Sequence, residues 1–211
     1  EEQELVFEPA PENKKKIAFL LLLGGSLIHY SSLTLLPVLF LSNKPFNKKT
    51  TILFLCAIPL GYVVYYAGGS ILMNPSLPFI GNKLAIYQAA VEKGKMTVGI
   101  NIFDPLHIMS IMLFYYLLLF KDSLTKLCDD FPILLKTSAI GLSLYSALAF
   151  LPVLALRTSQ LYCIVNILLY TYIIYTFKQK WIGISMVVVI SLLLLYVSIP
   201  HYGLGMMIIP N

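Results

Sequence analysis

The sequence predicts an all-α, polytopic integral membrane protein with about six transmembrane helices and one long amphipathic extracytoplasmic loop. Hydrophobic residues make up 58% of its 211 residues and charged residues 12%, against about 25% charged residues in a soluble domain. Its mean hydropathy is +0.82. The apolar runs are also longer than the alternating segments of about 10 residues that build a transmembrane β-barrel. Composition and run length together therefore favour membrane-spanning helices.

Polar and apolar segments divide the chain into two parts. Residues 1–16 contain several acids and end in a run of lysines, and we expect a polar lead-in there. Residues 17–211 are expected to form a single helical membrane domain, because they contain apolar segments of the length that crosses a hydrocarbon core of roughly 30 Å. The predicted spans cover residues 17–41, 51–73, 105–120, 132–156, 158–177 and 181–200.

The first predicted span carries unusual polar residues at membrane depth. His29 and Ser32 lie three positions apart, so a helix places them on the same face. An ionisable side chain inside a membrane is costly and usually faces a cavity, a partner or a substrate. One interpretation is a site with His29 as a catalytic residue and Ser32 as a substrate ligand. The other is a histidine bonded to a neighbouring helix. Both interpretations stay open.

The later spans show features of packed membrane helices. The second contains Pro59 and a cluster of tyrosines, which indicate a kink and either a membrane interface or a cavity wall. The third begins after an Asp-Pro step and has His107 one turn inside. The fourth contains serines, alanines and a glycine that suit close helix–helix contact. We expect residues 121–130 to be a polar loop, and the short turn before the fifth span to carry Arg157.

The longest polar interval inside the apolar chain covers residues 74–104. Loops longer than about 12–15 residues are uncommon unless they are functional or disordered. Residues 83–93 have apolar side chains at helical spacing and predict a short amphipathic helix in the headgroup plane. With six predicted spans, the loop shares a membrane face with the N-terminus, Arg157 and the C-terminal tail. A substrate-binding role is predicted for Lys83, Tyr87, Lys93, Lys95 and Asp104.

Arg157 is the single arginine of the chain, and all other basic side chains apart from the histidines are lysines. A guanidinium stays charged and offers a planar fork that matches a phosphate bidentately. Arg157 is therefore predicted to hold the phosphate or pyrophosphate of a substrate, and the alternative is a snorkelling headgroup anchor. The net charge of +5 forms no basic stripe outside the membrane, so no nucleic-acid partner is expected.

Several common types of site lack their sequence signatures in this chain. The three histidines form no HExxH motif or close pair, and the three cysteines form no CxxC pair, so no metal site is expected. The chain contains no GxSxG motif, Walker A motif or Rossmann fingerprint. We therefore expect chemistry by ordinary side chains, without a metal or cofactor.

Short motifs along the chain point to a family. The segment KKKIAFLLLLGGSLIHYSSLTLLPVLFL carries an H-x-S … L-P pattern at His29, Ser31 and Pro37. KLAIYQAAVEKG (residues 83–94) has the pattern K-L-x-x-Y, Arg157 precedes a span rich in Tyr, Ile and Leu, and the chain ends in IIPN. Together these motifs resemble the C-terminal portion of the EpsG-like, Wzy-type bacterial polysaccharide polymerases, which make O-antigen, capsule or exopolysaccharide.

The resemblance implies a metal-independent glycosyltransferase that crosses the bacterial inner (plasma) membrane several times. It implies that undecaprenyl-pyrophosphate-linked oligosaccharide repeat units are joined into surface polysaccharide, with undecaprenyl pyrophosphate as the leaving group. Arg157 is expected to hold the pyrophosphate as a catalytic residue, and His29 to act as a base or to orient the substrate. The expected partners are the lipid-linked oligosaccharide, membrane lipids and a chain-length regulator.

Two other functions remain compatible with the sequence. A transporter or flippase of lipid-linked sugars would use the same cationic surface without forming a bond, and broken helices in paired halves are typical of such proteins. The sequence shows no such pairing. A non-catalytic membrane subunit would tolerate the substitution Arg157→Lys, whereas a polymerase that uses the guanidinium fork would not.

Overall fold

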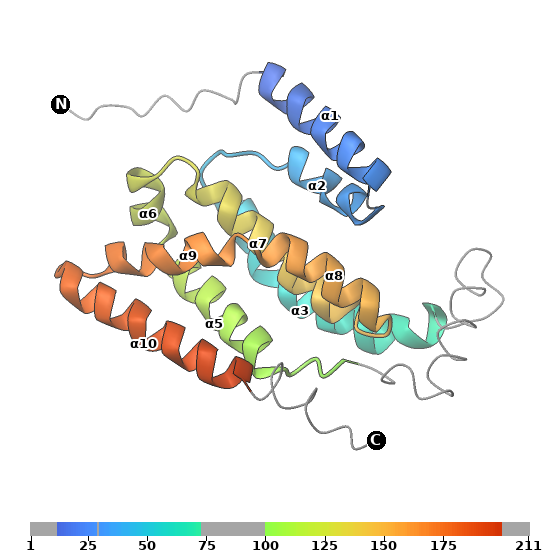
Figure 1. Cartoon of the computed structure of the whole chain (residues 1–211). Helices are drawn as coiled ribbons and strands as arrows, with labels where there is room; N and C mark the ends of the chain where they lie inside the picture. Colours follow the sequence, from blue (N-terminus) through green and yellow to red (C-terminus); the bar gives the residue numbers. More distant parts are fainter. Residues whose placement is uncertain (1–11, 29, 73–99, 200–211) are drawn as a thin grey trace.

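The computed structural model describes residues 12–28, 30–72 and 100–199, and the statements below concern these residues. They form helices and connecting turns without a strand, which confirms the all-α prediction (Figure 1). In chain order the elements are α1 (Glu12–Ile28), η1 (Tyr30–Leu35), α2 (Leu36–Leu39), α3 (Lys48–Leu72), α5 (Pro105–Leu119), α6 (Lys121–Leu127), α7 (Phe131–Ala147), α8 (Pro152–Cys163), α9 (Asn166–Tyr172), η2 (Ile173–Thr176) and α10 (Lys180–Ile199).

Helix α7 is the centre of the bundle, because it contacts α3, α5, α8 and α9 and most of its side chains are buried. Glycines allow α3 and α8 to approach α7 most closely. A Cβ added at Gly61 of α3 would lie 2.5 Å from the Ser143 carbonyl oxygen, and one at Gly141 would lie 2.5 Å from Cβ of Tyr162. The Ser143 hydroxyl also donates to the carbonyl oxygen of Ala57 at 2.7 Å. Small and hydroxyl-bearing residues therefore hold α3 and α8 against α7, as expected for helices packed in a membrane.

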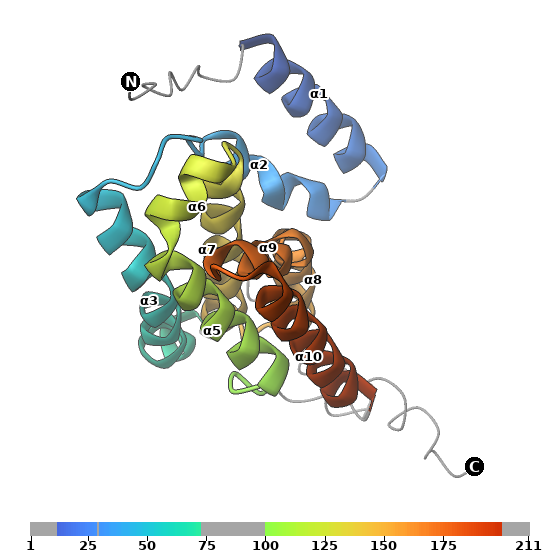
Figure 2. The same cartoon turned by 90° about the vertical axis from the view of Figure 1, so that its left-hand side faces the viewer.

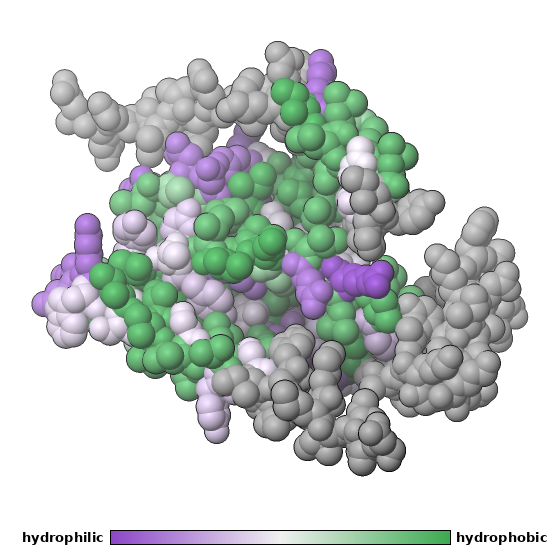
Figure 3. Space-filling view, in the orientation of Figure 1, coloured by the Kyte–Doolittle hydropathy of each residue, from purple (hydrophilic) through white to green (hydrophobic). Residues whose placement is uncertain are grey.

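Helix α10 lies at the outside of the bundle, where it packs on η2 and α5. Both views show α5 between α3 and α10 (Figures 1 and 2). Large apolar side chains are exposed along α10 and α3, and hydrophobic residues cover much of the face shown in Figure 3. Exposed apolar area of this extent indicates a surface that contacts lipid. The described chain is thus a membrane protein, in agreement with the sequence.

Two described helical segments are long and apolar enough to cross a membrane, Lys48–Ala67 in α3 and Lys180–Ser198 in α10. The number rises to four if each of two bent pairs is one span. Helix α5 is bent by 78° from α6, and α8 is bent by 43° from the helical stretch that continues through α9 and η2. The prediction of about six spans stays a prediction.

The first predicted span, residues 17–41, is wrong as a single helix. Helix α1 ends at Ile28, and the chain then runs through the 3-10 helix η1 and the short α2. Ser and Thr side chains compete for backbone hydrogen bonds, and this stretch contains several of them. A Cβ added at Gly25 would lie 3.2 Å from Oγ of Ser32, so η1 folds back against α1 at a glycine.

The fourth predicted span, residues 132–156, is also wrong as a single helix. Helix α7 ends at Ala147, and α8 begins at Pro152. Proline lacks the N–H that would continue a helix and is favoured at the first helical positions, so it starts α8 rather than extending α7. The predicted polar loop 121–130 contains the short helix α6. The predicted spans 51–73, 105–120 and 181–200 agree with α3, α5 and α10 within three residues.

Candidate functional site

The turn that leads into α5 is built from polar residues. Oδ1 of Asn101 accepts from the backbone N–H of Phe103 at 3.0 Å, and the N–H of Asp104 donates to the Asn101 carbonyl oxygen at 3.0 Å. Oδ1 of Asp104 then caps α5 by accepting from the N–H of Leu106 at 2.8 Å. Pro105 follows at the first helical position, where its missing N–H costs no hydrogen bond. The sequence N-x-x-D-P thus fixes the start of the helix.

Two tyrosines from different helices bind the carbonyl oxygens of this turn. The Tyr62 hydroxyl of α3 donates to the carbonyl oxygen of Ile102 at 3.0 Å. The Tyr145 hydroxyl of α7 donates to the carbonyl oxygen of Asn101 at 3.2 Å. The Tyr62 ring also stacks on Phe103, with 5.8 Å between the ring centroids. The second half of α3, the start of α5 and the end of α7 therefore meet at this turn.

His107 lies beneath this turn, one helical turn inside α5, and is 7% exposed. Its Nε2 lies 3.2 Å from Oγ of Ser146, which is fully buried in α7. The imidazole stacks on the Tyr145 ring at a centroid distance of 4.2 Å, and Tyr62 approaches to 6.4 Å. The histidine is thus held from two sides by aromatic rings and from a third by a hydroxyl. Because an ionisable side chain inside a membrane protein is costly, such a residue indicates a functional site.

We refer to Asn101–Asp104, Tyr62, His107, Tyr145 and Ser146 together as the α5 cluster. Asp104 is half-buried at the start of α5, three residues before the buried His107. The α5 cluster therefore places a carboxylate near the surface and an imidazole below it, and the carboxylate is the group placed to accept a proton. Within the described ranges, no group of three His, Cys, Asp or Glu side chains lies close enough to hold a metal ion.

The structure describes three of the predicted site residues. Asp104 lies in the α5 cluster, Ser32 lies half-buried in η1, and Arg157 lies exposed on α8. Of these, Ser32 and Arg157 belong to elements that touch, because η1 packs on α8. The Tyr162 hydroxyl of α8 donates to the carbonyl oxygen of Thr34 in η1 and secures this contact. Five predicted site residues lie outside the described residues: His29, Lys83, Tyr87, Lys93 and Lys95.

The position predicted for Arg157 in a short turn is wrong. The break between the helices lies before Pro152, and Arg157 is five residues farther on, about 8 Å along α8. The buried face of α8 packs on α7, and Arg157 shares the exposed side with Gln160. The guanidinium is therefore presented away from α7, on a helix that begins at the same end of α7 as Tyr145 and Ser146.

Most of the α5 cluster was not predicted as a site. The sequence marks His107 only as a residue one turn inside a span, and Tyr62 only as part of a tyrosine cluster. The signal that identifies the site is the combination of an Asp-Pro helix start with a histidine three positions after the aspartate, because these residues share one end of a helix. Tyr145 and Ser146 carry no local signal, since only the packing of α7 on α5 brings them to His107.

The comparison with known families gives one result. The family model described as "EpsG family" matches residues 9–210, which is nearly the whole chain and includes all of the α5 cluster and Arg157. No curated protein and no solved structure matches the chain significantly.

Proposed function

The chain belongs to the EpsG family, and on that premise we propose that it is a membrane glycosyltransferase that polymerises undecaprenyl-pyrophosphate-linked oligosaccharide repeat units into surface polysaccharide. Membership in the family indicates a membrane protein of polysaccharide biosynthesis. The observation that supports a catalytic role best is the α5 cluster, because it combines a half-buried carboxylate with a buried imidazole at the end of a candidate span.

The proposed reaction joins two lipid-linked substrates. A sugar hydroxyl of the incoming unit loses its proton and attacks the anomeric carbon of the growing chain. The new C–O glycosidic bond forms while the bond from that carbon to the pyrophosphate oxygen breaks. Undecaprenyl pyrophosphate leaves with the electron pair of the broken bond. The enzyme must therefore accept a proton and stabilise a developing anion.

Asp104 is the proposed proton acceptor for the sugar hydroxyl. It is half-buried rather than enclosed, and its role as helix cap holds the carboxylate at the N-terminus of α5. His107 acts as a positioning residue behind it. His29, predicted from the sequence as a base or as a residue that orients the substrate, keeps the second of these roles in the proposal.

Arg157 is the proposed ligand of the leaving pyrophosphate. Its guanidinium is exposed on α8, so a long and flexible side chain is able to reach a headgroup at the surface. Planar, bidentate recognition of phosphate favours arginine over lysine. Lys83, Tyr87, Lys93, Lys95 and Ser32 are proposed to bind the saccharide and phosphate portions of the substrates.

One observation favours a second candidate, a transporter of lipid-linked sugars. The pairs α5–α6 and α8–α9 are bent by 78° and 43°, and broken helices occur at the substrate sites of transporters. A bond-forming assay separates the two functions. In detergent-opened liposomes that contain the lipid-linked repeat unit, both membrane faces are accessible. Transport across the membrane then gives no signal, and a transporter forms no ladder of lengthened saccharides.

The test uses the full chain and the variant Arg157→Lys in those opened liposomes. We expect a ladder of lengthened saccharides from the wild type and a loss of at least about 100-fold with the variant, as is typical when a group that stabilises transition-state charge is removed. Gln160→Ala, on the same side of α8, is the matched control and should keep the ladder. A wild-type ladder from Arg157→Lys would remove the arginine from the mechanism, and no ladder from the wild type would overturn the polymerase.

A further inference from the structure

Phe103 is the exposed aromatic residue of the α5 cluster. Its side chain is 58% exposed, whereas the preceding Ile102 is 7% exposed. The backbone N–H of Phe103 donates to Oδ1 of Asn101, and the carbonyl oxygen of Ile102 accepts from the Tyr62 hydroxyl. The turn is therefore fixed by hydrogen bonds on both sides of Phe103, and it presents an apolar ring at the surface.

The Phe103 ring lies on a second aromatic ring. Tyr62 stacks on it with 5.8 Å between the centroids and 24° between the ring planes. The hydroxyl of Tyr62 is bonded to the turn at 3.0 Å, so the supporting ring is itself held in place. Phe40, in contrast, is 87% exposed and stacks on no other ring of the described chain. Tyr62 thus orients the Phe103 ring in advance, which lowers the entropy cost of binding a ligand on it.

Polar side chains flank the Phe103 ring in the chain. Asn101 is exposed two residues before it, and the half-buried Asp104 follows it directly, about 3.8 Å away between Cα atoms. Amide and carboxylate groups are costly in hydrocarbon, so this side of the α5 cluster meets water or a polar ligand rather than lipid tails. An aromatic ring among such groups fits a ligand with an apolar face and polar edges.

A sugar ring is a ligand of this kind. The C–H groups on one face of a pyranose carry partial positive charge and pack on the negative face of an aromatic ring. The hydroxyls at its edge bond to amide and carboxylate groups. Membership in the EpsG family indicates polysaccharide biosynthesis, so a saccharide is the expected ligand.

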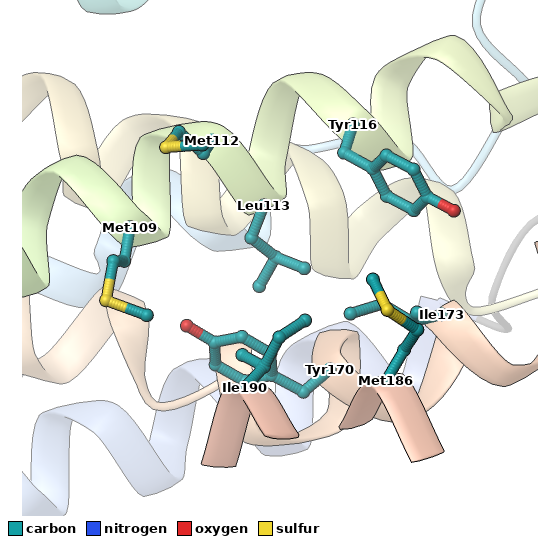
Figure 4. A pocket seen from close by; sticks show the side chains of 8 residues that line it. All are labelled: Met109, Met112, Leu113, Tyr116, Tyr170, Ile173, Met186 and Ile190. Carbon is teal, nitrogen blue, oxygen red and sulfur yellow. The ribbon is translucent and has the colours of Figure 1, made fainter. Parts of the chain in front are cut away.

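An apolar groove of about 210 Å³ between α5 and α10 does not suit a saccharide (Figure 4). Helix α5 forms one wall and α10 the other, and the lining includes Met109, Met112 and Met186. These side chains offer carbon and sulfur, which do not replace the hydrogen bonds that sugar hydroxyls make with water. The combination of a ring with polar groups at Phe103 suits a saccharide better.

We propose that Phe103, supported by Tyr62, binds one face of the acceptor sugar and so holds a hydroxyl of that sugar at Asp104. The proposal rests on the proposed function, because it assigns a sugar site to the same reaction. Phe103 binds the substrate and takes no part in proton transfer, and Asn101 bonds to a hydroxyl at the edge of the sugar. Loss of the Phe103 ring should therefore weaken binding more than it slows the bound substrate.

Variants of Phe103 test the site in the ladder assay. Phe103→Leu keeps an apolar side chain but removes the ring, and should raise KM for the lipid-linked repeat unit about fivefold with a smaller change in kcat. Phe103→Trp restores an aromatic ring and should recover most of the affinity. Phe40→Leu, at an exposed position outside the α5 cluster, is the matched control. A wild-type KM for Phe103→Leu would overturn the proposal in favour of an apolar contact with the membrane.

Tryptophan fluorescence measures binding without turnover. Trp181 is the single tryptophan of the chain, so Phe103→Trp in a Trp181→Phe background gives one reporter at the site. The full chain in lipid nanodiscs is titrated with the repeat-unit oligosaccharide released from its lipid by mild acid. We expect a saturable change in emission with a Kd on the order of 1 mM.

Lipids brominated on their acyl chains separate a sugar site from a lipid contact, because bromine quenches a tryptophan that touches the chains. Val188→Trp in the same background is the control, since Val188 is 52% exposed on α10. It should be strongly quenched by brominated lipid and should not respond to the oligosaccharide, and Phe103→Trp should show the reverse. Strong quenching of the Phe103→Trp variant without a response to the oligosaccharide would overturn the proposal.

The two proposals fail in different ways. If the oligosaccharide changes the emission of the Phe103→Trp variant but the full chain forms no saccharide ladder, the sugar site stands and the polymerase falls. If the ladder forms while the emission does not change and Phe103→Leu keeps the wild-type KM, the polymerase stands and the sugar site falls.

Discussion

Helix α7 binds a connecting segment near each of its ends, and the two contacts differ in chemistry. Near its start, Nζ of Lys136 donates to the carbonyl oxygens of Ser42 and Lys44 at 2.6 and 2.8 Å and lies 5.1 Å from the centre of the Phe46 ring. Near its other end, the Tyr145 hydroxyl donates to the Asn101 carbonyl oxygen. Both contacts attach a loop to the central helix through backbone carbonyl groups.

The two contacts differ in the groups that they place near the surface. Lys136 is 3% exposed, and its charge is used by two carbonyl oxygens and one ring, so nothing remains for a substrate. The α5 cluster holds its loop with neutral hydroxyls and keeps a half-buried carboxylate beside a histidine. A buried polar contact is therefore not by itself a sign of function. The contact that leaves a titratable group near the surface is the stronger candidate.

Among the variants that compare the two loop contacts of α7, Asp104→Asn in the α5 cluster is expected to have the largest effect. Asparagine caps a helix as well as aspartate does, so the fold should persist while the proton acceptor is lost. We expect ladder formation in opened liposomes to fall by about 10²- to 10⁴-fold, the range for a general base. Asp129→Asn, an exposed carboxylate near the start of α7, is the control. Normal activity of Asp104→Asn would leave the α5 cluster a structural contact like that of Lys136.

Lys136→Met should produce the opposite pattern, a loss of stability without a loss of polymerising activity. The variant leaves two carbonyl oxygens without their charged donor and should lower the free energy of unfolding by about 3 kcal/mol. For a chain of this size that corresponds to a fall in the melting temperature of roughly 6–12 °C. Thermal unfolding in detergent measures it, with the exposed Lys126→Met as control. Loss of the ladder in protein that is still folded would contradict a purely structural role.

Gly61→Ala tests the packing that brings Tyr62 of α3 to the α5 cluster. The added Cβ would lie 2.5 Å from the Ser143 carbonyl oxygen, and overpacking of this kind costs about 1–3 kcal/mol. Gly24→Ala in α1 meets no atom within 4 Å and is the matched control in the same melting experiment. Equal melting temperatures for the two variants would show that α3 and α7 are not in this close contact.

Tyr145→Phe should have the smallest effect. It removes the hydroxyl that binds Asn101 but keeps the ring that stacks on His107, so the expected loss of stability is about 1 kcal/mol. Tyr175→Phe, at an exposed position, serves as control. A much larger fall in activity than in stability would indicate that the hydroxyl contributes to the site beyond attaching the loop.

Sequence patterns predicted long helices well where one face meets lipid. In α3, α5 and α10 the apolar run itself marks the element, because most side chains that face lipid are apolar. The patterns did less well in residues 17–41 and 132–156, where the helix breaks lie inside apolar runs. Hydropathy does not indicate such breaks. They are indicated by Pro152 and by the hydroxyl-rich stretch before Pro37.

What the sequence by itself determined is the membrane class, the all-α fold, the family and the start of α5 after the Asp-Pro step. These depend on composition, on short-range spacing and on local hydrogen bonds, which neighbouring residues decide. Only the tertiary structure brought Tyr62, Tyr145 and Ser146 around His107 and moved Arg157 into a helix. These features join residues from separate helices, and their contacts arise from packing that no local pattern records.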